Sequence, residues 1–227
     1  MKLLQRDKLS RRTRPGVREY RLVFDQRLAD GDSYPDAWQG LGRLVSLVDA
    51  ELQPQAQACL NPRDDLDAVT LVLNGRIRNA ASRADSDMCV AWDVQIQAAE
   101  PGGGGHMLVN PDETAARVVQ LLLWPAMRND PAGSRLLQPA EGSVTRIGGA
   151  EGGAQADDSA SRTCIDLARL QLGQSLDIDK PALVYVCEGS GFANEDMVTT
   201  GALIRSDQLT FDATNDTGLL IIHEEPA

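Results

Sequence analysis

The sequence predicts an all-β protein built from two halves. Short apolar segments rich in β-branched residues follow one another along the chain, and turn residues separate them at intervals of about 8–12 residues. No alternation of strands with helices favours a parallel α/β sheet. The 227 residues are enough for one large β-rich domain or two small ones, and either can bury a core.

The first half of the chain contains five segments that we expect to be strands. Val17–Phe24 alternates apolar and polar residues, as a half-buried strand does. Asn74-Gly75 predicts a hairpin whose return strand opens at Ile77, because both turn residues tolerate a positive φ. The other four expected strands are Gly42–Val48, Ala68–Leu73, Met88–Gln97 and Val118–Trp124.

The segment Val118–Trp124 has a second interpretation, since residues 112–116 resemble the first turn of a helix. We favour a strand, because two β-branched residues lead a run of only seven. Pro125 ends the segment in either case.

The second half resumes the strand pattern after a connecting segment. Residues 147–161 are rich in Gly, Ala, Asp and Ser, and predict a flexible linker. We therefore expect an N-terminal barrel with a basic arm over 1–146, the linker over 147–161 and a C-terminal barrel over 162–227. The strands expected after the linker are Cys164–Leu172, Ala182–Cys187, Gly201–Arg205, Gln208–Phe211 and Gly218–His223.

The two halves are also similar in layout. In VTLVLNGRIRNA and in ALVYVCEGSGFAN an apolar strand meets a Gly turn, and the chain returns within a few residues. This weak internal similarity suggests a duplicated β-barrel.

Composition argues against several kinds of partner and site. The formal net charge of −11 argues against nucleic acid as a partner, because phosphate binding requires a basic face. Two histidines are too few for a site with three or four imidazole ligands. No apolar run approaches the roughly 18–20 residues that span a bilayer, and no signal-peptide pattern begins the chain. We therefore expect a cytoplasmic protein with no membrane partner.

The four cysteines form no CxxC pair and no zinc-binding spacing with the histidines. In a reducing compartment they are expected to be free thiols. Cys89 and Cys187 lie in apolar segments, and we expect them to pack as small buried hydrophobic residues. A redox-sensing thiol is the alternative.

Positive charge is concentrated at the start of the chain. Residues 1–28 contain nine basic and three acidic groups, which gives a net charge of +6. This basic arm could bind an anion or a polymer. We favour docking of the arm on the chain's own acidic body or on a second subunit, which allows a homo-oligomer or another protein partner.

Five segments share their order and spacing with a known family. They are DAVTLVLNG (67–75), DVQIQAAEPG (93–102), VQLLLWP (119–125), TGALI (200–204) and LLIIHEEP (219–226). Together they resemble the pirin-like bicupins over roughly residues 40–227. The resemblance implies two cupin-like β-barrels of the double-stranded β-helix type in one chain.

The metal ligands of that family do not carry over to this sequence. The family places His-x-His before a strand of the first barrel, and a His with a carboxylate beyond a Gly-rich turn. The matching positions here are Asn61 and Arg63, followed by Gly105 and Met107 or, in a second register, Leu108 and Asn110. The fixed positive charge of Arg63 would repel a divalent cation.

The resemblance therefore implies a metal-free pirin-like bicupin that binds a small ligand or acts as a regulator. We expect no metal, no cofactor and no catalytic residues. Asn61, Arg63 and His106 would form the polar mouth of a pocket in the first barrel, and Arg63 would favour a small anionic ligand such as a carboxylate. The alternative is a cupin enzyme, a quercetinase-like dioxygenase or an isomerase, with an atypical ligand set.

The two histidines have separate interpretations. His106 follows four glycines, so that a mobile loop could bring it to the barrel mouth, but an exposed loop residue is the interpretation we favour. His223 lies on an apolar strand near the C-terminus and is expected to be structural.

Overall fold

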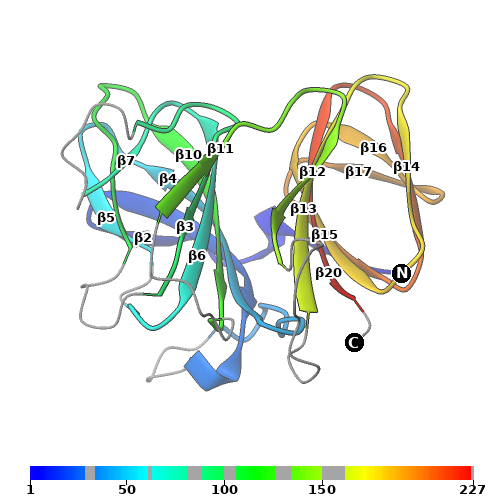
Figure 1. Ribbon diagram of the computed structural model, residues 1–227, viewed down its shortest axis with the longest axis horizontal. Helices are drawn as coiled ribbons and strands as arrows, with labels where there is room; N and C mark the ends of the chain where they lie inside the picture. The colour runs from blue at the N-terminus through cyan, green and yellow to red at the C-terminus, as the bar shows by residue number, and fades with distance from the viewer. Residues whose placement is uncertain are drawn as a thin grey trace. The chain divides into compact units, whose positions relative to one another are not determined.

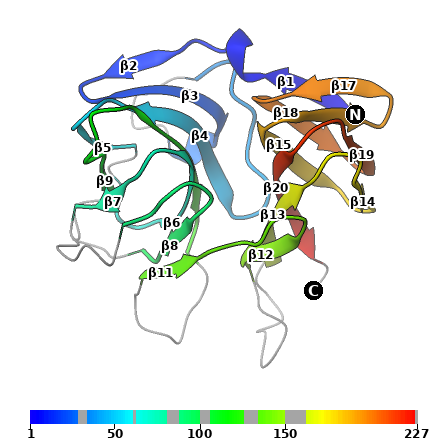
Figure 2. The same ribbon diagram turned by 90° about the horizontal axis from the view of Figure 1, so that it is seen from above.

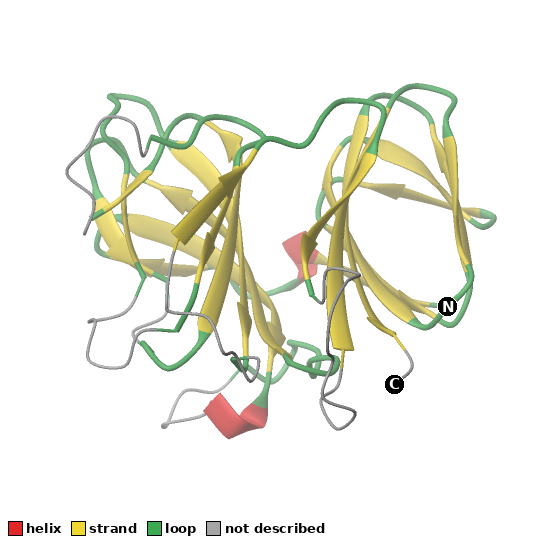
Figure 3. Cartoon of the chain, in the orientation of Figure 1, coloured by secondary structure: helices red, strands yellow, loops and turns green. Residues whose placement is uncertain are grey.

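The structure is a computed structural model that describes residues 1–28, 34–60, 63–80, 88–99, 106–125, 134–149 and 162–225. Nearly all regular structure in these ranges is β-strand (Figure 3). Two 3-10 helices, η1 (Arg6–Lys8) and η2 (Gln26–Leu28), interrupt the strands. No helix in the described ranges is long and apolar enough to cross a membrane. The predicted all-β fold class is confirmed.

The chain divides into two compact units. The first barrel comprises Leu9–Gln138, and the second barrel comprises Met1–Lys8 together with Pro139–Ala227 (Figure 1). The predicted boundary at residue 146 does not coincide with this division, because β12 (Val144–Gly148) pairs with β13 (Arg162–Leu170) in the second barrel. Most of the predicted linker, from residue 150 to residue 161, lies outside the described residues.

The first barrel consists of a large and a small antiparallel sheet. The large sheet has the strand order β11-β8-β6-β10-β4-β3-β2, and the small sheet has the order β5-β9-β7. The strands of this barrel are β2 (Arg12–Arg14), β3 (Val17–Phe24), β4 (Leu44–Leu52), β5 (Gln57–Cys59), β6 (Asp67–Asn74), β7 (Arg78–Asn79), β8 (Val94–Gln97), β9 (Met107–Val109), β10 (Ala116–Leu123) and β11 (Ser134–Leu137).

The second barrel has the same construction. Its large sheet has the order β1-β18-β15-β20-β13-β12, and its small sheet has the order β14-β19-β16-β17. The further strands are β1 (Lys2–Gln5), β14 (Ser175–Ile178), β15 (Ala182–Glu188), β16 (Ser190–Ala193), β17 (Asp196–Thr199), β18 (Ala202–Ser206), β19 (Leu209–Ala213) and β20 (Thr217–Glu225).

Five strands of one large sheet match five strands of the other in order. The order β8-β6-β10-β4-β3 of the first barrel corresponds to β18-β15-β20-β13-β12 of the second. The small sheets correspond in the same way, β5-β9-β7 to β14-β19-β16. This topology agrees with the duplication that the weak internal similarity suggested.

The structure corrects two local predictions. Gly75 does adopt a positive φ of 77°, but β6 pairs with β8 and β10, whereas β7 pairs with β9 in the small sheet. The predicted hairpin is therefore wrong, because the chain crosses from one sheet to the other at this turn. The expected strand Met88–Gln97 begins only at Val94, after Trp92 takes a φ of 70°.

The hydrophobic core of each barrel lies between its two sheets. In the first barrel, Val48 and Val118 of the large sheet pack in one cluster with Ala58 and Leu108 of the small sheet. In the second barrel a separate cluster joins the residues of β13, β15, β18 and β20 to Phe211 of the small sheet. Residues that alternate with these along each strand face the other way.

Cysteine packing follows the expectation from sequence. Cys89, Cys164 and Cys187 are buried, and Cys59 is half-buried. Their burial confirms that Cys89 and Cys187 pack as small hydrophobic residues.

The basic arm is part of the fold. Strand β1 pairs with β18 from Lys2↔Arg205 to Gln5↔Ala202, and Figure 2 shows this blue strand beside β18. Further along the arm, Arg18 Nη1 lies 3.4 Å from Glu51 Oε1, and β2 pairs with β3. These contacts agree with docking of the arm on its own chain. A second subunit or another partner stays a prediction.

Deletion of residues 1–5 is expected to lower the melting temperature of the protein by roughly 5 °C, because β18 loses its antiparallel neighbour over four residue pairs. Calorimetry or circular dichroism measures the change. The matched control is the double variant Lys2→Gln, Lys8→Gln, which removes charge but keeps the backbone pairing and should melt like the wild type. A truncated protein that melts with the wild type would contradict the structural role of β1.

Candidate functional site

A row of mostly polar side chains crosses the interior of the first barrel. Cross-strand register places Arg21 of β3 opposite Val48, Val48 opposite Gln120, Gln120 opposite Thr70, and Thr70 opposite Gln95 of β8. Directly opposed residues point to the same face of a sheet, and Val48 belongs to the core between the two sheets. All five side chains are buried. We call these five residues the interior row.

Several polar atoms in and beside the interior row have no hydrogen-bond partner among the described residues. Gln120 Nε2 does donate to Thr70 Oγ1, at 3.2 Å. Buried polar atoms are nearly always hydrogen-bonded to protein, to water or to a ligand. This part of the barrel interior therefore suits water molecules or a polar ligand. The buried atoms without a described partner are Arg21 Nε, Ser46 Oγ, Gln95 Oε1, Gln97 Oε1 and Gln120 Oε1.

Two arginines share one buried carboxylate at the end of the row. Glu19, which is 1% exposed, accepts hydrogen bonds from Arg14 Nη2 at 2.5 Å and from Arg21 Nη2 at 3.3 Å. Both guanidinium groups also donate to the backbone oxygen of Leu60, at 3.3 and 3.0 Å. One carboxylate against two guanidinium groups leaves one unit of positive charge. The Nε–H of each arginine is buried without a described partner, so the network can still donate to an anion.

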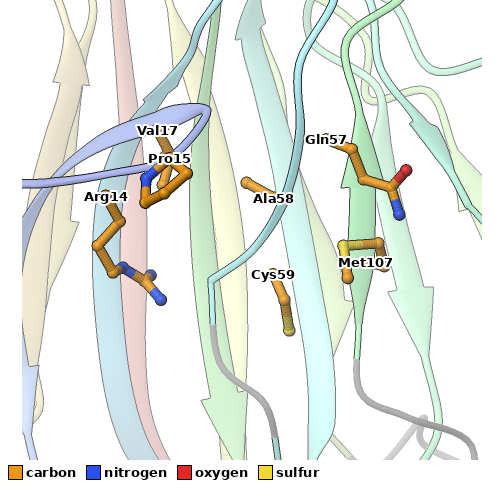
Figure 4. Close-up of a pocket in the computed structure, with 7 residues that line it drawn as sticks. All are labelled: Arg14, Pro15, Val17, Gln57, Ala58, Cys59 and Met107. Atoms are coloured by element: carbon orange, nitrogen blue, oxygen red, sulfur yellow. The ribbon is translucent and has the colours of Figure 1, made fainter.

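A pocket of about 370 Å³ lies beside this network. Its size is at the lower end of small-molecule sites, which run from about 300 to 1,000 Å³. Arg14 extends from the end of β2 into the view of Figure 4, on the side of the pocket opposite Met107. One charged group on a wall that also has apolar side chains suits a small organic anion. The lining residues are Arg14, Pro15, Val17, Gln57, Ala58, Cys59 and Met107 (Figure 4).

Of the three residues predicted to form the pocket mouth, Asn61 lies outside the described residues. Arg63 is half-buried and donates to the Asp65 carboxylate through Nε, at 2.8 Å, and Nη2, at 2.5 Å. Its guanidinium carbon lies 5.6 Å from the centroid of the Trp124 ring. The Arg63 cation is therefore directed at a neighbouring carboxylate. Its role toward a ligand stays a prediction.

His106, the third predicted residue, is buried rather than exposed. The residue is 6% exposed, and its Nε2 atom lies 2.9 Å from the backbone oxygen of Leu66. The interpretation as a solvent-exposed loop residue is therefore wrong, because this hydrogen bond and the surrounding barrel hold the imidazole inside. A role at a pocket mouth stays a prediction.

Where the structure describes them, three of the positions that the sequence resemblance matches to the family's metal ligands have other contacts, and the loss of that metal site stays a prediction. Arg63 is a cation in an ion pair. Leu108 belongs to the apolar core. The Asn110 side chain is occupied by backbone groups, since Nδ2 donates to three carbonyls and Oδ1 accepts one N–H. Two further positions, Asn61 and Gly105, lie outside the described residues.

A second group of titratable side chains lies in the second barrel, where the sequence predicts no site. Cys164, His223 and Glu225 each bring one potential ligand atom within 4.8 Å of the others. His223 Nε2 lies 3.0 Å from Asp166 Oδ2. Arg146 binds both carboxylates, through Nε to Asp166 at 2.5 Å and through Nη2 to Glu225 at 3.1 Å.

These contacts change the interpretation of His223. The residue is 2% exposed and structural in its packing, as expected, but it also joins a charged cluster. The signal in the sequence is a pair of polar residues two positions apart on each of two strands, Cys164 with Asp166 and His223 with Glu225. It becomes meaningful only once β13 and β20 are known to pair.

Replacing Gln95 with Leu is expected to stabilise the ligand-free protein by about 1 kcal/mol, because the variant no longer buries an amide oxygen without a partner. Urea denaturation measures the free energy of unfolding. Thr70→Val in the same row is the matched control and should cost about 1 kcal/mol, since Gln120 loses its acceptor. Equal destabilisation in both variants would show that Gln95 has a protein partner.

Replacing Arg63 with Gln is expected to raise the pKa of Asp65, because the hydrogen-bonded guanidinium holds the pKa of that carboxyl below its ordinary value. Since the folded pKa lies below the unfolded one, the pair stabilises the fold above the unfolded pKa, and this contribution is lost as pH falls through the folded pKa. NMR titration of the carboxyl groups measures the pKa of Asp65. Asp112, whose pKa is lowered by Arg76, is the control and should not change. An unshifted Asp65 would mean that Arg63 is not committed to this pair.

No family model and no curated protein matches the sequence. Solved structures do match it over its whole length. YhhW from Escherichia coli has a TM-score of 0.77 at 15% identity, covering 100% of this chain and 98% of that one. A second structure, bacterial pirin YhhW from Escherichia coli in complex with nickel(II), has a TM-score of 0.72 at 14% identity, with 100% and 99% covered.

A quercetin 2,3-dioxygenase from Acinetobacter baumannii is similar as well, with a TM-score of 0.65 at 18% identity, covering 100% of this chain and 86% of that one. Identities this low establish the fold alone. The resemblance seen in the sequence and the matched barrels agree with these structures. The chain therefore has the two-barrel cupin fold of the pirin-like bicupins.

Proposed function

We propose that the first barrel binds a small organic anion in the pocket beside the interior row. The protein would then be a ligand-binding or regulatory bicupin that uses no metal in this barrel. One observation carries the proposal. Arg14 and Arg21 share the single carboxylate of Glu19, so that one positive charge is left over beside the pocket that Arg14 lines.

The pocket walls define the class of ligand. A carboxylate would accept hydrogen bonds from Arg14, which both lines the pocket and belongs to the buried network. The rest of the ligand would pack against Pro15, Val17 and Met107. A short carboxylic acid with an aliphatic or aromatic body meets both requirements.

The residues expected from the sequence keep a place in the proposal. Asn61, Arg63 and His106 would add polar groups at the mouth of the barrel, with Arg63 as a second cation once a ligand carboxylate replaces Asp65 as its partner. A second copy of the chain, or another protein held through the basic arm, also stays a prediction.

Thermal unfolding with acetate, benzoate and succinate tests the proposal, with benzamide as an uncharged control. A carboxylate present at ten times its Kd should stabilise the protein by about 1.4 kcal/mol. The Arg14→Met variant should lose this stabilisation. Arg18→Met, an exposed arginine of the same arm, is the matched control and should keep it.

Three outcomes would overturn the proposal. They are the absence of stabilisation by any of the carboxylates, equal stabilisation by benzamide, and full stabilisation of the Arg14→Met variant. The last would place the anion elsewhere on the chain.

The similarity to a protein described as quercetin 2,3-dioxygenase supports one alternative, a cupin enzyme with an atypical ligand set. Metal content and quercetin turnover separate the two proposals. Both are measured on the Cys164→Val variant, so that metal held by the cluster of the second barrel does not count. Stoichiometric metal together with turnover in this variant would favour the enzyme.

A further inference from the structure

The cluster in the second barrel lies on the interior face of the large sheet. Cys164 of β13 is directly opposite His223 of β20, and opposed residues share a face. Ile221, two residues before His223, and Ala168, four residues after Cys164, point to the same face and belong to the core between the sheets. Glu225, two residues beyond His223, continues this face towards the end of β20. The three side chains therefore meet at one end of the barrel interior.

The His223 ring is held in one orientation by a carboxylate. Nε2 lies 3.0 Å from Asp166 Oδ2, so the proton of a neutral ring is on Nε2, where it is donated to Asp166. The lone pair is then on Nδ1. That atom is buried and has no hydrogen-bond partner among the described residues. A carboxylate that binds the distal nitrogen of an imidazole in this way orients the ring for a metal.

The charges of the cluster leave a place for a cation. Two carboxyl groups, Asp166 and Glu225, face one guanidinium group, Arg146. The acidic side chains of the cluster therefore outnumber its arginine, and an additional cation would be favourable there.

Cys164 is a resting thiol rather than a reactive thiolate. Burial raises the pKa of Cys164 to about 11, against the opposing effect of Arg146, and the thiol is hydrogen-bonded to the Glu225 carboxylate. This arrangement disfavours a redox role, because the thiolate is the reactive form. A metal ion could take the place of the shared proton between sulfur and carboxylate.

We propose that Cys164, His223 and Glu225 form a zinc-binding site in the second barrel, with Asp166 positioning His223 and Arg146 positioning Glu225. Sulfur, nitrogen and oxygen ligands together suit Zn²⁺ among the common divalent ions. Three protein ligands leave a fourth position for water or a small ligand. Binding releases the proton of the Cys164 thiol. This proposal departs from the prediction, made from the sequence, that the protein binds no metal. It does not depend on the proposed binding of an anion in the first barrel.

Cobalt(II) titration of the full-length, metal-stripped protein tests the proposal, because a cobalt–thiolate bond gives a charge-transfer absorption in the near ultraviolet. We expect one equivalent of Co²⁺ to bind with this absorption, and one equivalent of Zn²⁺ to displace it. Cys164→Val should abolish the absorption. Cys187→Ala, a buried thiol of the same barrel that is outside the cluster, should retain it.

Asp166→Asn provides a graded second variant. It keeps the three ligands but disturbs the hydrogen bond that fixes the His223 ring, and should weaken zinc binding by about 10–100-fold in a chelator competition. Circular dichroism confirms that each variant is folded. The proposal is overturned if the folded wild type shows no thiolate absorption with Co²⁺, if Cys164→Val retains it, or if Asp166→Asn binds zinc as the wild type does.

Discussion

The antiparallel register of the two large sheets decides which side chains meet inside each barrel. Side chains alternate between the faces of a strand, so a register shift of one residue would move every interior group to the opposite face. The pairing of β3, β4, β10, β6 and β8 places Arg21, Gln120, Thr70 and Gln95 in one row, with Val48 between Arg21 and Gln120. In the second barrel, the pairing of β13 with β20 brings Cys164 opposite His223.

Burial of charge is the second constraint. A charged group removed from water is costly unless a partner and hydrogen bonds compensate it. Glu19 meets this requirement with two arginines, and Asp166 meets it with Arg146 and His223. Removal of either carboxylate would leave its cationic or hydrogen-bonding partners uncompensated, which explains why each network forms a unit rather than a set of independent pairs.

Strand positions were largely predictable from the sequence, because alternation and turn residues are local signals. Val17–Phe24 coincides with β3, and the expected strand Val118–Trp124 ends one residue after β10 ends. The partner of a strand is not a local property. Gly75 adopts the turn conformation expected of it, yet the chain beyond it joins another sheet, so the hairpin prediction failed.

The candidate sites were harder to predict for the same reason. Gln95 and Gln97 alternate with apolar residues and read as the exposed face of a half-buried strand, yet both are buried. A polar face turned towards the barrel interior looks the same in sequence as one turned towards solvent. Cys164 and His223 are 59 positions apart, and only the strand order brings them together.

Comparison of the matched strands relates the two sites. Strand β3 of the first barrel corresponds to β12 of the second, and each supplies an arginine that binds carboxylates, Arg21 and Arg146. In the first barrel a second arginine joins, so one carboxylate faces two cations and positive charge is left over. In the second barrel a second carboxylate joins, so the surplus is negative. The duplicated fold therefore carries a surplus of arginine in the network of one half and a surplus of carboxylate in that of the other, because the shared framework brings different side chains together in each half.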